Sequence, residues 1–135
     1  MALFPWNKKK SPALPQPKSG WPWILTVGGY SGSSSDPGWQ EIEEELQELI
    51  QDSDSYLILE QKNPRNPKEY WFIQCAVAIV GPDQGNYAVE VGFSSPEGSQ
   101  LWERMVPGSR EAAAYFFAAY HHKFVDFSGF EKMEL

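Results

Sequence analysis

"YWFIQCAVAIVGPDQGNYAVEVGF", residues 70–93, decides the fold class of this 135-residue chain. Its two apolar runs are rich in β-branched and aromatic residues, and a Gly-Pro-Asp-Gln-Gly turn separates them. Apolar and polar side chains alternate along both runs, which is the period of a strand with one buried face. The predicted core face consists of Trp71, Ile73, Cys75, Val77, Ile79, Tyr87, Val89, Val91 and Phe93. The stretch therefore predicts two antiparallel strands joined by a short turn.

Further strand patterns lie on both sides of this pair. "WILTV" (23–27), "SYLILEQ" (55–61) and "QLWERMV" (100–106) are short and β-rich. The turns "NPRNPKE", "GPDQG" and "SPEGS" join the last four strands in sequence. Consecutive strands with short turns favour an antiparallel meander.

Two segments have helical patterning. In "WQEIEEELQELIQDSD" (39–54) one apolar stripe is expected to face the core, and it consists of Trp39, Ile42, Leu46, Leu49 and Ile50. Asp36 is the expected cap of this helix and Pro37 its first residue. "PGSREAAAYFFAAYHHKF" (107–124) predicts a second helix with Ser109 as its N-cap. The apolar face of this second helix is wider than one stripe, so it is either buried on the sheet or partly committed to an oligomer.

The predicted order of elements is β-α-β-β-β-β-α. This order predicts an α+β fold in which two helices pack on one face of an antiparallel sheet of about five strands. Phe127 and Phe130 are expected to pack as a closing strap. Residues 1–20 are rich in proline and lysine and predict a flexible tail, which leaves 21–135 as a single domain.

The charge distribution limits the classes of partner. Residues 1–22 carry four lysines and no acid, so they sum to +4, and the remaining seven basic and eighteen acidic residues sum to −11. A body this acidic repels nucleic-acid phosphates, so DNA or RNA binding is not expected. No apolar run is long enough to predict a membrane span, and no apolar region follows the first basic residues as in a secretory signal. The expected compartment is the cytoplasm.

No complete catalytic, metal or cofactor signature is present. Cys75 is the sole cysteine and lies in an apolar run, so it is expected in the core. Adjacent His121 and His122 project about 100° apart on a helix and do not suit one metal ion. The glycine-rich loop after residue 27 leads into glutamates that oppose a phosphate. We therefore predict no catalytic residue, no metal site and no cofactor.

The polar side of the first helix is uniformly acidic. Its carboxylates are Glu41, Glu44, Glu45, Glu48 and Asp52. Each pair of like charges four residues apart destabilises a helix by a few tenths of a kcal/mol, so the uniform sign indicates that this face has a function. A field of one sign steers a basic partner, although an acidic protein can also carry its excess charge on one solvated helix.

A second polar set lies on the predicted outer face of the sheet. If the register allows, Glu60, Gln74 and Glu90 form a row, which Glu103 or Arg104 extends. Such a row can be a binding surface, an acid/base pair or the solvated side that alternation demands. Trp102 is the tryptophan expected to be free for contact with a partner.

These strands, followed by "AAAYFFAAYHHKF", make residues 36–125 resemble two kinds of small bacterial protein. One is the immunity proteins of polymorphic or contact-dependent toxin systems, and the other is the small acidic chaperones of secretion systems. The first resemblance implies a cytoplasmic α+β domain that binds and blocks a toxin. A secretion chaperone would be expected to open with a helix, and the proline-rich basic tail belongs to neither pattern.

The leading hypothesis is a non-enzymatic, immunity-like or inhibitor-like domain that presents its acidic helix to a basic protein partner. Two alternatives stay open: a small hydrolase or transferase that uses the sheet carboxylates, and a homodimer formed through the second helix or a sheet edge.

Overall fold

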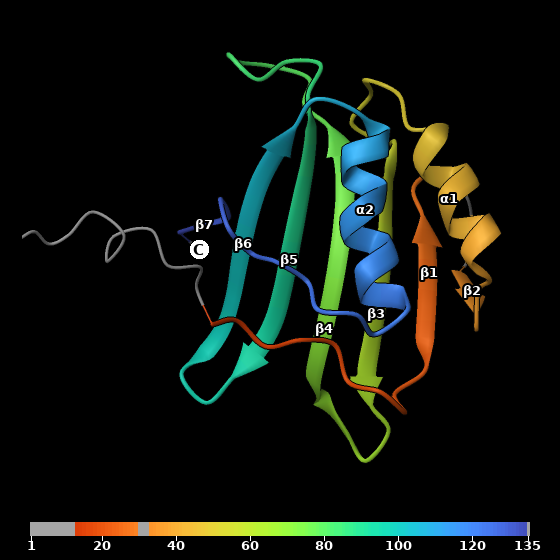
Figure 1. Cartoon of the computed structure of the whole chain (residues 1–135), viewed down its shortest axis with the longest axis vertical. Coiled ribbons are helices and arrows are strands. Elements are labelled where there is room, and N and C mark those ends of the chain that lie inside the picture. Colours follow the sequence, from red (N-terminus) through yellow and green to blue (C-terminus); the bar gives the residue numbers. More distant parts are fainter. Residues whose placement is uncertain (1–12, 30–32, 135) are drawn as a thin grey trace, which may run out of the picture.

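The computed structural model describes residues 13–29 and 33–134 and forms one antiparallel sheet with two helices (Figure 1). The sheet has seven strands in the order β2-β1-β3-β4-β5-β6-β7. The strands are β1 (Trp23–Val27), β2 (Ser33–Ser35), β3 (Tyr56–Asn63), β4 (Asn66–Val77), β5 (Tyr87–Ser95), β6 (Gly98–Val106) and β7 (Glu131–Lys132). The helices are α1 (Trp39–Gln47) and α2 (Ser109–Tyr120).

The α+β class, the antiparallel sheet and the five predicted strands are confirmed, but the predicted strand count is too low. Two short strands, β2 and β7, lie at the edges of the sheet. β2 consists of three serines that pair with β1, inside the segment predicted as a loop. Both edge strands are held by backbone pairing and bury little side chain, so hydrophobic periodicity gives no sign of them.

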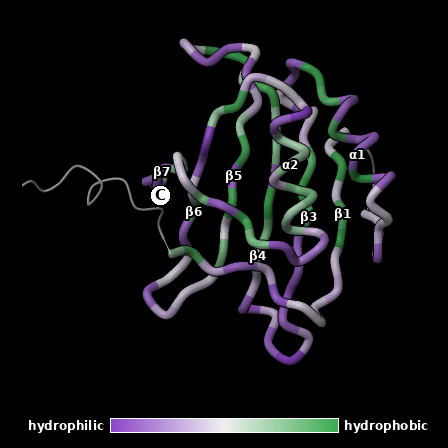
Figure 2. Tube along the Cα trace, in the orientation of Figure 1, coloured by the Kyte–Doolittle hydropathy of each residue, from purple (hydrophilic) through white to green (hydrophobic). Residues whose placement is uncertain are grey.

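The core lies between the sheet and the helices, which cover the same face (Figure 1). Alternate residues of the four strands β1, β3, β4 and β5 are buried there, as the apolar stripes along these strands in Figure 2 indicate. The predicted core face of residues 70–93 is confirmed except on the two sides of its central turn. Tyr87 is half-buried, and Ile79 is 41% exposed because β4 ends at Val77.

The apolar stripe of α1 also differs from the prediction at its ends. Ile42, Leu46 and Leu49 are buried, whereas Ile50 is 62% exposed because the helix ends at Gln47. Gly38 is the N-cap of α1, and no side chain caps it. Asp36, the predicted cap, has φ 53° and lies before the helix.

The predicted N-cap of the second helix is also shifted by one residue. Gly108 is the N-cap of α2, and Ser109 is its first helical residue. Neither described helix is long and apolar enough to cross a membrane.

The segments before β1 and after α2 cross the helix-covered face of the sheet (Figure 1). The Gln16 side chain donates to the Val125 carbonyl and accepts from the Val125 N–H, which ties the two segments together. The buried Gln61 amide on β3 bonds Lys18 and Trp21. Residues 13–20 are therefore fixed to the domain, unlike the flexible tail predicted for 1–20, of which residues 1–12 lie outside the described part.

The closing strap after α2 is confirmed. Phe127 and Phe130 are both buried and meet edge to face, with ring centroids 5.4 Å apart.

Candidate functional site

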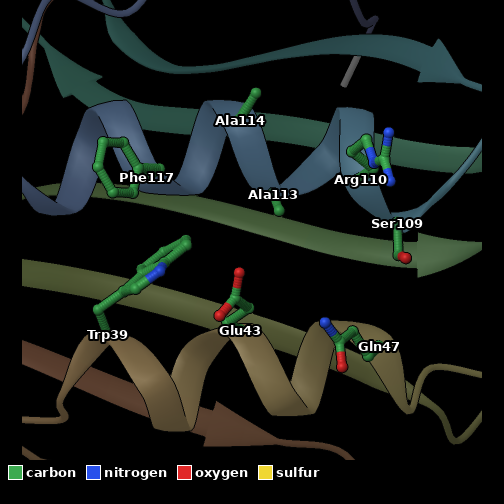
Figure 3. Close-up of a pocket in the computed structure, with 8 residues that line it drawn as sticks. All are labelled: Trp39, Glu43, Gln47, Ser109, Arg110, Ala113, Ala114 and Phe117. Carbon is green, nitrogen blue, oxygen red and sulfur yellow. The ribbon is translucent and has the colours of Figure 1, made fainter.

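A groove of about 640 Å³ lies between α1 and α2. The two helices run antiparallel, and side chains from both point into the space between them (Figure 3). The lining residues are Trp39, Glu43, Gln47, Ser109, Arg110, Ala113, Ala114 and Phe117. Those of α1 recur every four residues, which places them on one side of the helix. The small Ala113 and Ala114 side chains leave the middle of the groove open.

The two ends of the groove differ in chemistry. At one end the Trp39 and Phe117 rings meet edge to face, with centroids 5.2 Å apart, and Phe117 is 39% exposed. At the other end Arg110 and Ser109, in the first turn of α2, lie across from Gln47 (Figure 3). The Glu43 carboxylate lies between the two ends. The groove therefore presents aromatic surface, one carboxylate and one guanidinium in sequence along its length.

The outer side of α1 carries the predicted acidic face. Glu41, Glu44 and Glu48 are exposed, Glu45 is half-buried, and Asp52 lies beyond the end of the helix. Partial burial raises the pKa of Glu45, and the neighbouring charges of Glu48, Glu41 and Glu44 raise it further. The sequence has no lysine, arginine or histidine between Lys18 and Lys62. The structure thus gathers four of the five predicted carboxylates on α1 and its C-cap, on a side of the helix that does not line the groove.

A second candidate site lies on the sheet face away from the helices. The register places Ile58, Gln74, Glu90, Glu103 and Glu131 in one row across β3–β7. Gln74 Nε2 donates to Glu90 Oε1 at 2.5 Å. A hydrogen bond with Glu90 raises the pKa of Glu103 to about 7, with smaller contributions from burial and from the charges of Glu90, Asp83 and Glu131. The Glu103 carboxyl therefore keeps its proton, beside Glu90, up to near neutral pH.

Two residues predicted for this row lie elsewhere. Glu60 pairs with Phe72 one row away, because Ile58 is the residue of β3 that lies opposite Gln74. Arg104 points to the helix-covered face, where its Nη1 donates to the Tyr115 hydroxyl and the Ser128 carbonyl. Glu103 is thus the residue that extends the row.

A hollow of about 290 Å³ adjoins the row between Tyr56, Ile58, Ala76 and Ala88. Gln74 and Glu90 supply its polar wall. Cys75 also borders the hollow, but its side chain is in the core. Burial, with a smaller contribution from Glu90, raises the pKa of Cys75 to about 12, so this thiol is no nucleophile at neutral pH.

Trp102 is not the free contact residue that was predicted. It lies on the helix-covered side of β6, half-buried against the core, and its Nε1 donates to Gln100. His121 and His122 contact different aromatic rings: His121 packs at a tilt against Phe117, and His122 stacks on Trp23. Within residues 13–29 and 33–134, no three histidine, cysteine or carboxylate side chains converge as metal ligands.

Sequence reasoning missed the groove itself. It required the spacing of α1 and α2, and the only trace in the sequence is the run of alanines that widens the apolar face of the second helix. No protein-family model, curated protein or solved structure matches the chain.

Proposed function

We propose that this protein is a non-enzymatic, immunity-like or inhibitor-like domain that binds a basic segment of a protein partner. The observation that carries the proposal is that one helix, α1, presents a row of carboxylates on its outer side and lines an open groove with another side. α1 is acidic along its outer side, and the groove offers Trp39 and Phe117 for apolar contact. This pairing of charge with aromatic anchors is what steered, specific association requires.

The charge pattern has a cost that a basic partner would offset. Glu41 with Glu45 and Glu44 with Glu48 are like-charge pairs four residues apart, each unfavourable by a few tenths of a kcal/mol. Positive charge placed against this side of α1 relieves that repulsion. The same field attracts a basic segment during diffusion and raises its association rate.

Binding to labelled basic, neutral and acidic peptides of matched apolar content tests the proposal. The wild type should bind the basic set fastest, and the association rate should fall as salt increases. Changing Glu41, Glu44 and Glu48 to Gln should slow association by about tenfold. The matched control changes Glu69, Glu97 and Glu134 to Gln, the same loss of charge away from α1. Equal rates for the two triple variants would rule the proposal out.

A second candidate function, a small hydrolase of the acid/base type, is favoured by the position of Glu103 directly opposite Glu90 and by its raised pKa. Two carboxyl groups with one proton between them can polarise a water molecule. The volume of the adjoining hollow is close to that of the smallest ligand pockets. Model ester, glycoside and amide substrates test this candidate. Turnover that is greatest near pH 7 and absent from both Glu90→Gln and Glu103→Gln would support it, and no turnover by the wild type would dismiss it.

A further inference from the structure

We propose that the groove between α1 and α2 binds a short segment that carries both charges, with a cationic side chain at the Trp39–Phe117 end and a carboxylate at the Arg110 end. This inference rests on the proposed function and names the chemistry of its ligand. The groove would take an extended peptide in which an apolar residue lies between a basic and an acidic residue, in either chain direction.

The cation site follows from the aromatic end. A guanidinium or ammonium group is attracted to the faces of Trp and Phe rings, and here two such rings meet at one wall of the groove. Phe117 keeps 39% of its surface exposed, so a ligand can reach it. Glu43, one helical turn after Trp39, supplies a carboxylate beside the rings. A planar arginine suits such a site better than lysine, because it can stack on a ring and hydrogen-bond a carboxylate together.

The anion site follows from the opposite end. Arg110 is the one basic residue that lines the groove, and it lies in the first turn of α2. The N-terminal end of a helix also favours negative charge. A guanidinium here repels a second cation, so a uniformly basic peptide fits the groove less well than one with an acid at this end.

The distance between the ends limits the ligand. Trp39 and Gln47 are eight residues apart on α1, which is ~12 Å at 1.5 Å per residue. An extended peptide covers that length in roughly four residues. An apolar side chain between the two charged ones would lie over Ala113 and Ala114, where the groove is open (Figure 3).

Fluorescence anisotropy with three labelled peptides tests the inference: Arg-Ser-Leu-Ser-Asp between neutral flanks, the same residues with the two charges adjacent (Ser-Leu-Arg-Asp-Ser), and the first peptide with Asn in place of Asp. The first peptide should bind about tenfold tighter than the one with adjacent charges, which cannot reach both ends of the groove. Phe117→Ala and Glu43→Gln should each weaken the first peptide by about fivefold. Arg110→Gln should abolish the difference between the Asp and Asn peptides.

Two control variants match these changes outside the groove. Phe124→Ala removes a ring that is 74% exposed, and Glu97→Gln removes one carboxylate from the exposed turn between β5 and β6, outside the groove lining and away from α1. Equal binding of the peptides with separated and with adjacent charges, or groove variants that bind like the controls, would overturn the inference. If basic peptides still bind and still respond to Glu41, Glu44 and Glu48, the proposed function survives without the groove. If no peptide binds, both fail.

Discussion

At position 103 a carboxyl group lies directly across the strand pair from Glu90, and their hydrogen bond raises its pKa from the usual 4.5 to about 7. The folded protein therefore holds this proton more tightly than the unfolded chain does. The contribution of Glu103 to stability is complete below about pH 4.5 and is lost as the pH rises through about 7. At higher pH the two carboxylates face each other unprotonated.

Replacing Glu103 with Gln should stabilise the protein at pH 8 and change little at pH 5. The amide can donate to Glu90 at any pH, as the protonated acid does at low pH. Because Glu103 is half-exposed, solvent screening reduces the expected gain to on the order of 1 kcal/mol, or roughly 3 °C in melting temperature. Thermal unfolding at both pH values measures it, with Glu97→Gln in the exposed β5–β6 turn as the control. An equal gain at both pH values would contradict the raised pKa of Glu103.

The Cys75 thiol should be inert to alkylating and disulfide reagents in the folded protein. It is 1% exposed, and its pKa of about 12 leaves almost no thiolate at neutral pH. Labelling should therefore follow unfolding and become fast only in denaturant. A reagent that counts free thiols, added with and without urea, measures this, and rapid labelling of the native protein would be inconsistent with the burial of Cys75.

In α1, replacing Glu45 with Gln should raise the free energy of unfolding by about 0.5 kcal/mol at neutral pH. Its pKa is raised in the folded state, so its ionised form opposes folding, and this penalty grows as the pH rises. Glu111→Gln, in the first turn of α2, is the control. There a carboxylate suits the helix dipole, so the control should lose stability or stay unchanged. Urea unfolding compares the two, and a loss of stability in Glu45→Gln would refute the repulsion.

Elements with a strong apolar period could be predicted from the sequence, and elements held by backbone pairing could not. The strand at 23–27 has the predicted bounds, and the buried residues of α1 lie on the predicted stripe. β2 and the two glycine caps bury no apolar side chain that a pattern could detect. The predicted position of Glu60 was wrong for another reason. The β3–β4 register depends on an irregularity between Lys62 and Asn63, which two-residue alternation does not encode.

At the scale of the whole molecule, the features that could not be predicted from the sequence are those that depend on contacts between distant segments. The α1 carboxylates were predicted because they share one helix, whereas the groove beside them requires two helices that are about seventy positions apart in sequence. The carboxyl pair similarly joins β5 to β6, and the raised pKa of Glu103 depends on both strands. The prolines before β1 predicted a loose tail. The attachment of this segment could not be predicted, because the side chains that hold it, Gln61 and Trp71, lie on strands far along the chain.

Gln61 links the N-terminal segment to the sheet, so Gln61→Ala should destabilise the whole domain. Its side chain is fully buried and bonds the Lys18 N–H, the Lys18 carbonyl and the Trp21 carbonyl. Truncation leaves these backbone groups unpaired beside a cavity, at an expected cost of about 2–3 kcal/mol in the free energy of unfolding.

Urea unfolding measures this loss, and hydrogen exchange at the Lys18 amide reports whether the segment loosens. Gln84→Ala, an exposed glutamine in the β4–β5 turn, should leave both quantities unchanged. The loss of stability should also extend to the strap after α2, because the Gln16 side chain bonds both the backbone N–H and the carbonyl of Val125. Faster exchange at Lys18 and Val125 together would show that the two segments close this face of the sheet as one unit, whereas faster exchange at Lys18 alone would show that they act separately.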